Sequence, residues 1–198
     1  GYLRIINLLS FLIFPTMLGL VAIAPEMFML LLGEKWMPTV PYFEILALSG
    51  LFYPLAIVAY NIIKVRSDGR VILRLEVVKR VVMTIILAVT IPLGIEAVAW
   101  GMTAMAAVDF IINLAAAMPY VNIGIAPILR ALIPQFVVAA IMFMALNLVN
   151  PYLSALSCGV HLLLDIAIGA ISYLALAHTF RLRALREGVA LLRELIKR

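Results

Sequence analysis

Two pairs of polar residues lie inside long apolar segments of the chain. Of all residues in the sequence, they are the strongest candidates for a chemical role. Asp109 and Asn113 are four positions apart, as are His161 and Asp165, and this spacing puts both members of a pair on one face of a helix. A carboxylate in hydrocarbon costs at least about 2.5–3.5 kcal/mol, so it must face protein or water, or be protonated. We therefore predict either a substrate or ion path at these pairs, with Asp109 and Asn113 as first candidates, or hydrogen bonds between neighbouring helices.

Two further polar residues lie nearer the ends of one apolar segment. Glu44 is about one turn from its first end, and Asn61 about one turn from its second. They are candidates for the two mouths of the same path. The alternative is that Glu44 is an acid at a helix start and that Asn61 anchors the helix at the membrane interface.

The sequence shows no motif for covalent or metal chemistry. Its single cysteine is Cys158, its two histidines, His161 and His178, stand far from each other, and we recognise no metal-ligand cluster motif. It also lacks a Gly-rich phosphate loop after a strand, a Ser-His-Asp set and a basic stretch interleaved with aromatics. We therefore expect no catalytic residue, no metal, no cofactor and no nucleic-acid partner.

Membrane helices must position these residues. Hydrophobic residues make up 66% and charged residues 13% of the 198 residues, against about half and about a quarter in soluble domains. A span needs about 20 apolar residues, and no segments alternate apolar and polar residues as a barrel requires. The sequence predicts an all-α polytopic bundle with six spans and a basic amphipathic helix over 181–198. The spans are expected at about 5–24, 40–63, 71–93, 97–117, 128–149 and 153–180, with kinks expected at Pro15, Pro54 and Pro134.

The distribution of cations predicts the orientation. With six spans, all of the 15 Lys and Arg residues except Lys35 fall on one side, and the positive-inside rule makes that side cytoplasmic. Both termini are then cytoplasmic. Every cation is expected at a span end, and Lys79 and its neighbours Arg74 and Arg80 should extend to the inner headgroups.

Several runs of residues resemble the second half of oligosaccharide flippases, which belong to the multidrug/oligosaccharidyl-lipid/polysaccharide exporter superfamily. They are Ala24-Pro25-Glu26, Leu32-Gly33-Glu34-Lys35-Trp36, Val40-Pro41, Ile45-Leu46-Ala47-Leu48-Ser49-Gly50, Asp68-Gly69-Arg70 and Gly94-Ile95-Glu96-Ala97-Val98-Ala99-Trp100-Gly101. Ala97 stands where the family has a glycine. The resemblance implies a partial second lobe of a MATE-like transporter fold. Residues 1–118 would be the last four spans of that lobe, 119–180 two additional spans, and 181–198 a basic cytoplasmic helix.

The resemblance also implies a function. The chain would be part of a bacterial inner-membrane transporter, not an enzyme, that flips lipid-linked oligosaccharide for lipopolysaccharide or exopolysaccharide biosynthesis. Its partners would be membrane lipids, that substrate and an upstream part of the same transporter. Lys64, Arg66 and Arg70 would contact the headgroup at the cytoplasmic mouth. The alternatives are an ion-coupled multidrug exporter, a membrane-embedded sugar-transfer enzyme and an assembly subunit.

The predicted topology can be tested by cysteine labelling. After Cys158→Ser, a cysteine placed at position 198 should react with a membrane-impermeant maleimide only in permeabilised cells, because six spans put both ends in the cytoplasm. Labelling of that position in intact cells would contradict both the orientation and the number of spans.

Overall fold

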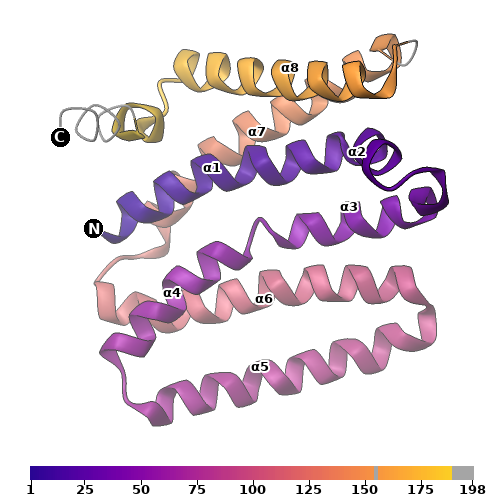
Figure 1. Cartoon of the computed structure of the whole chain (residues 1–198). Coiled ribbons are helices and arrows are strands. Elements are labelled where there is room, and N and C mark those ends of the chain that lie inside the picture. The colour runs from indigo at the N-terminus through magenta and orange to yellow at the C-terminus, as the bar shows by residue number, and fades with distance from the viewer. Residues whose placement is uncertain (154–155, 189–198) are drawn as a thin grey trace. The chain divides into compact units, whose positions relative to one another are not determined.

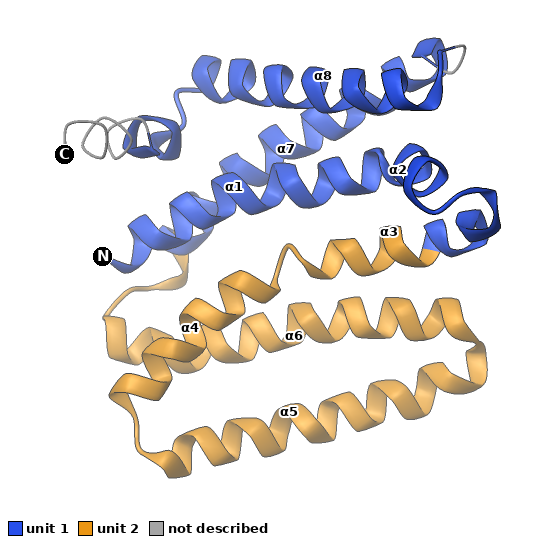
Figure 2. Ribbon diagram, in the orientation of Figure 1, with its two compact units in different colours: residues 1–41, 127–198 blue, residues 42–126 orange. Residues whose placement is uncertain are grey.

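The computed structural model describes residues 1–153 and 156–188, and the regular secondary structure in that part is entirely helical (Figure 1). The chain forms two compact units (Figure 2). Unit 1 contains Gly1–Pro41 and Pro127–Arg198, and unit 2 contains Tyr42–Ala126. The prediction of an all-α helical bundle is confirmed. The predicted boundary at residue 118 stays a prediction. It separates spans that resemble a transporter lobe from two additional spans, whereas the two units are defined by contacts within the chain.

Unit 1 brings the first helices of the chain together with the last. It contains α1 (Tyr2–Ala22), α2 (Ala24–Leu31), the 3₁₀ helix η1 (Glu34–Thr39), α7 (Ile125–Leu153) and α8 (Cys158–Thr179). The Tyr173 hydroxyl on α8 donates to the Phe11 carbonyl on α1 at 2.8 Å, and the two rings lie 5.2 Å apart. Phe14 on α1 meets Phe136 on α7 edge to face. Residues 183–188 are helical, whereas the rest of the predicted amphipathic helix lies outside the described residues.

Unit 2 is built around its last helix. Its elements are α3 (Val40–Ser49), α4 (Tyr53–Arg66), α5 (Gly69–Thr90), the 3₁₀ helix η2 (Ile91–Leu93) and α6 (Ile95–Val121). Helix α6 packs against both α4 and α5. Ala59, Ile63 and Ala117 form a buried cluster between α4 and α6, and Thr103 donates to the Ile45 carbonyl of α3 at 2.8 Å. Small residues therefore let α6 lie close to its neighbours.

Proline has different effects in different helices. The span predicted at 40–63 is two helices, because the N–H groups of Gly50, Leu51 and Phe52 bond to carbonyls three residues back and Pro54 starts α4. Pro15 and Pro134, by contrast, lie inside the continuous helices α1 and α7. Within the predicted spans at 5–24, 40–63 and 128–149, only the proline next to a glycine-containing turn interrupts the helix.

The described part of the chain contains five segments long and apolar enough to cross a membrane. The protein is thus a multi-pass membrane protein. The segment predicted as a span at 71–93 folds as α5, but its charged residues, Arg74, Glu76, Lys79 and Arg80, exclude it from those five. Its 22 residues extend about 33 Å, which is sufficient to cross. If α5 crosses, the two termini share one side of the membrane.

Gly101 sets the distance between α5 and α6. A Cβ atom at this position would lie 2.9 Å from methyl groups of both Ile86 and Thr90, which is closer than packed atoms tolerate. Gly101→Val should therefore destabilise the protein by about 1–3 kcal/mol, measured by thermal unfolding in detergent.

Gly124 provides the matched control, since no atom lies within 4 Å of a Cβ built there. Gly124→Val should unfold within about 0.5 kcal/mol of wild type. Equal stability of the Gly101 and Gly124 variants would mean that the contact between α5 and α6 is loose.

Candidate functional site

Asp109 pairs with a lysine. Its Oδ1 lies 3.0 Å from Nζ of Lys79 on α5, and the same Nζ lies 2.7 Å from Oε1 of Glu76. Lys79 is only 8% exposed, although it is the middle residue of a helix rather than its end. Lys79 thus pairs with acids inside unit 2, a contact that the sequence analysis did not anticipate. The predictions that it reaches the inner headgroups and that every cation lies at a span end stay predictions.

The predicted pair of Asp109 and Asn113 forms within α6. Asn113 Nδ2 donates to Oδ2 of Asp109 at 3.1 Å and to the Ala56 carbonyl of α4 at 3.4 Å. The Lys79 ammonium also lies 4.9 Å from the centre of the Tyr60 ring, within the range of a cation–π contact. We call Tyr60, Glu76, Lys79, Asp109 and Asn113 the lysine cluster. It joins three helices of unit 2 and contains two acids for one cation, so its formal charge is −1.

The structure does not bring the other candidates of unit 2 into this cluster. Glu44 is half-buried on α3, and Asn61 is exposed on α4. Lys64, Arg66 and Arg70 are exposed around the turn between α4 and α5. Their predicted contact with a headgroup stays a prediction.

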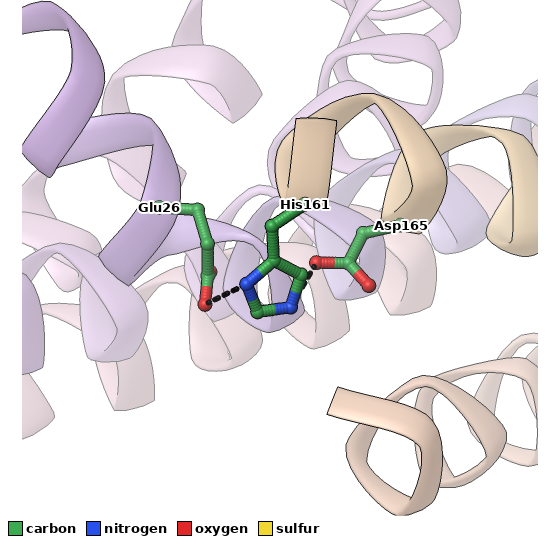
Figure 3. A group of neighbouring side chains, drawn as sticks. All are labelled: Glu26, His161 and Asp165. Carbon is green, nitrogen blue, oxygen red and sulfur yellow. Dashed lines mark ion pairs between the residues drawn. The ribbon is translucent and has the colours of Figure 1, made fainter. Parts of the chain in front are cut away.

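His161 and Asp165 meet a third residue that the sequence did not indicate. His161 Nδ1 lies 3.7 Å from Oε1 of Glu26 on α2, and its Nε2 lies 3.3 Å from Oδ2 of Asp165 (Figure 3). The Cys158 thiol donates to the Glu26 backbone carbonyl at 3.3 Å, which fixes the start of α8 against α2. Glu26, His161 and Asp165 are called the histidine cluster. Asp165 is the eighth residue of α8, counted from Cys158, so it lies nearer the helix start than the predicted span at 153–180 implied.

Arginines line a cavity of about 540 Å³ in unit 1. Arg4 comes from α1, Arg130 from α7, and Arg181 and Arg183 from the segment after α8. Arg4 lies 3.7 Å from Glu187, and among the described residues the other three have no acid within ion-pair distance. We call these residues the arginine pocket. Sequence reasoning placed its cations on one side of the membrane but had no means of bringing them together.

Two uncharged polar side chains also line the arginine pocket. Gln135 Nε2 of α7 donates to Asn7 Oδ1 of α1, and both side chains line the cavity. Arg181 has a φ of 51°, a left-handed conformation that costs a residue other than glycine about 1–2 kcal/mol. The turn therefore holds a cation where glycine would be less strained.

The comparisons with known proteins give one result. A family model described as "Polysaccharide biosynthesis protein" matches residues 1–41, which contain α1, α2, η1 and the start of α3. A search of curated proteins and a search of solved structures found no match. The match associates the first part of this multi-pass chain with polysaccharide biosynthesis.

The lysine cluster should show energetic coupling across α5 and α6. Lys79→Gln and Asp109→Asn should each lower stability by about 1–3 kcal/mol, less than for a fully enclosed pair because Glu76 remains and Asp109 is partly exposed. The double variant should lose about 1 kcal/mol less than the sum of the single losses. The measurement is thermal unfolding of all four proteins in detergent.

Arg80→Gln provides the control, because Arg80 is the next residue on α5 and is exposed. It should change stability by less than about 0.5 kcal/mol. Strictly additive losses for Lys79 and Asp109 would show that their contact contributes nothing.

Proposed function

We propose that this chain is part of a bacterial inner-membrane transporter that moves a lipid-linked oligosaccharide from the cytoplasmic to the outer leaflet for polysaccharide biosynthesis. The family match over residues 1–41 and the multi-pass fold support the general role. The arginine pocket is the observation that supports a phosphate-containing substrate. It includes Arg4, which lies within the matched segment.

The chemistry of the pocket suits a phosphate or diphosphate group. A guanidinium group is planar and always charged, and it binds phosphate oxygens with two parallel hydrogen bonds. A cavity of about 540 Å³ is within the range of small-molecule sites, about 300–1,000 Å³. Three arginines without a described acidic partner leave a surplus of positive charge for an anion.

The positions of the cations in the sequence agree with an uptake step from the cytoplasm. Under the positive-inside rule the ends of α1 and α8 that carry these arginines lie on the cytoplasmic side. The pocket would bind the phosphate of the lipid carrier there. The protein itself would form no covalent bond. It would bind, shield and release the headgroup while the complete transporter changes conformation.

Arginine variants of the full-length protein test this proposal. In cells that lack the native gene, Arg130→Gln should lower surface polysaccharide about tenfold or more and cause lipid-linked oligosaccharide to accumulate. The loss of one charge-assisted hydrogen bond costs about 1.5–3 kcal/mol, which corresponds to that change in affinity. Arg181→Gly is the sharper variant. It removes the cation but relieves the left-handed backbone, so export should fall while stability is kept or raised.

The control is Arg74→Gln, which removes an exposed cation of α5 that lies outside the pocket. It should leave export and membrane abundance at wild-type values. Normal export by a combined Arg130→Gln and Arg181→Gly variant at normal abundance would contradict the proposal.

The lysine cluster favours a second candidate, an ion-coupled exporter of small molecules. Glu76 and Asp109 provide one more negative charge than Lys79 balances, and a proton or Na⁺ could neutralise it. Export of a small cation that requires an ion gradient and is lost in Asp109→Asn, together with normal polysaccharide in the arginine variants, would favour this candidate.

A further inference from the structure

We infer that the histidine cluster is a binding site for a divalent transition-metal ion, with Glu26, His161 and Asp165 as its three protein ligands. One ligand atom from each residue can be chosen so that all three lie within 4.8 Å of one another. The sequence analysis expected no metal site. It could not bring these three residues together, because Glu26 is distant from the pair on α8 in sequence and reaches it only through the packing of α2 on α8.

The burial of unpartnered polar atoms is the first argument. His161 is 5% and Asp165 2% exposed. Both carboxylate oxygens of Asp165, Nε2 of His161 and Oε2 of Glu26 are buried and form no hydrogen bond, although Nε2 and Oδ2 of Asp165 lie 3.3 Å apart. Buried polar atoms are nearly always paired, and each unpaired group costs about 1–3 kcal/mol. Every residue of the cluster thus offers an atom that a bound ion would satisfy.

Charge is the second argument. With a neutral imidazole, the two carboxylates give the cluster a formal charge of −2, and in the described part of the chain neither acid forms an ion pair with lysine or arginine. In the lysine cluster, by contrast, two acids are balanced in part by the buried cation Lys79. A divalent cation would supply the missing positive charge here.

The donor set indicates which cations fit. Imidazole nitrogen is typical of transition-metal sites, whereas Mg²⁺ and Ca²⁺ prefer oxygen ligands alone. Zn²⁺ binds nitrogen and oxygen at about 2.0–2.2 Å, which spaces two ligands of a tetrahedron by about 3.4 Å. His161 Nε2 and Asp165 Oδ2 are 3.3 Å apart. Glu26 lies 3.7 Å from Nδ1 of the same ring, so its side chain would have to move toward Nε2 to complete the set. Three protein ligands leave a position open for water or exchange.

The surroundings place this site apart from the arginine pocket. Glu26 is in the first turn of α2 and His161 in the first turn of α8, so both helices begin at the cluster. Asp165 is also one of the residues that line a cavity of about 410 Å³ between α1, α7 and α8. A bound metal would hold α8 on α2. This inference does not depend on the proposed substrate.

Metal binding by the whole protein tests the inference. The protein is purified in detergent without a polyhistidine tag, stripped with EDTA and titrated with Zn²⁺ by calorimetry. We expect one Zn²⁺ per chain and a rise in Tm of several degrees, because an ion that binds only the folded state stabilises it. The affinity should fall at least tenfold in His161→Gln, Asp165→Asn and Glu26→Gln. In wild type, Co²⁺ should give the visible d–d absorption of a site with nitrogen and oxygen ligands.

The other histidine provides the control. His178 is exposed near the far end of α8, so His178→Gln should keep the stoichiometry and affinity of wild type. Absence of stoichiometric Zn²⁺ and Co²⁺ binding by wild type would overturn the inference even if the cluster variants fail to fold. Undiminished binding by a folded cluster variant would also overturn it.

Discussion

The cost of leaving a charge in a low-dielectric interior governs the arrangement of both units. A chain with 66% hydrophobic residues has abundant apolar surface, so apolar contact alone does not decide which helices meet. Polar groups do so more selectively, because each must find a partner within a few ångströms. The ion pair of Lys79 with Asp109 joins α5 to α6, and the hydrogen bond from the Tyr173 hydroxyl to the Phe11 carbonyl joins α8 to α1.

The same constraint separates what could be predicted from what could not. The apolar segments and Pro54 predicted the helices well, because span length and helix breaking are local properties. The pairing of Asp109 with Asn113 was also local, since four residues separate them on one helix. The ion pair of Lys79 was not predicted, because the sequence around it is basic and typical of a headgroup-facing turn. Its partner Asp109 is thirty positions away, and no periodicity in either segment reveals it.

The two clusters of unit 1 show the same limit more strongly. Glu26 was interpreted as part of a family-like run, and His161 with Asp165 as a pair on a separate span. The arginines of the pocket were counted individually for topology. In each case the sequence identified chemically informative residues but not their neighbours, because unit 1 joins residues 1–41 to residues that follow position 127. The segment that matches the family model, residues 1–41, therefore packs in one unit with residues that follow position 126.

The buried ion pair has a consequence for biogenesis. During synthesis α5 emerges before α6, so Lys79 first has only Glu76 of its own helix as a partner. Entry of α5 into the bilayer before α6 would leave Lys79 without Asp109 as a partner. A charge at the centre of a helix is rejected by the insertion machinery at a cost of about 2.5–3.5 kcal/mol. If α5 crosses the membrane, this cost falls once residue 109 has been synthesised, which favours entry of α5 and α6 into the bilayer together as a hairpin.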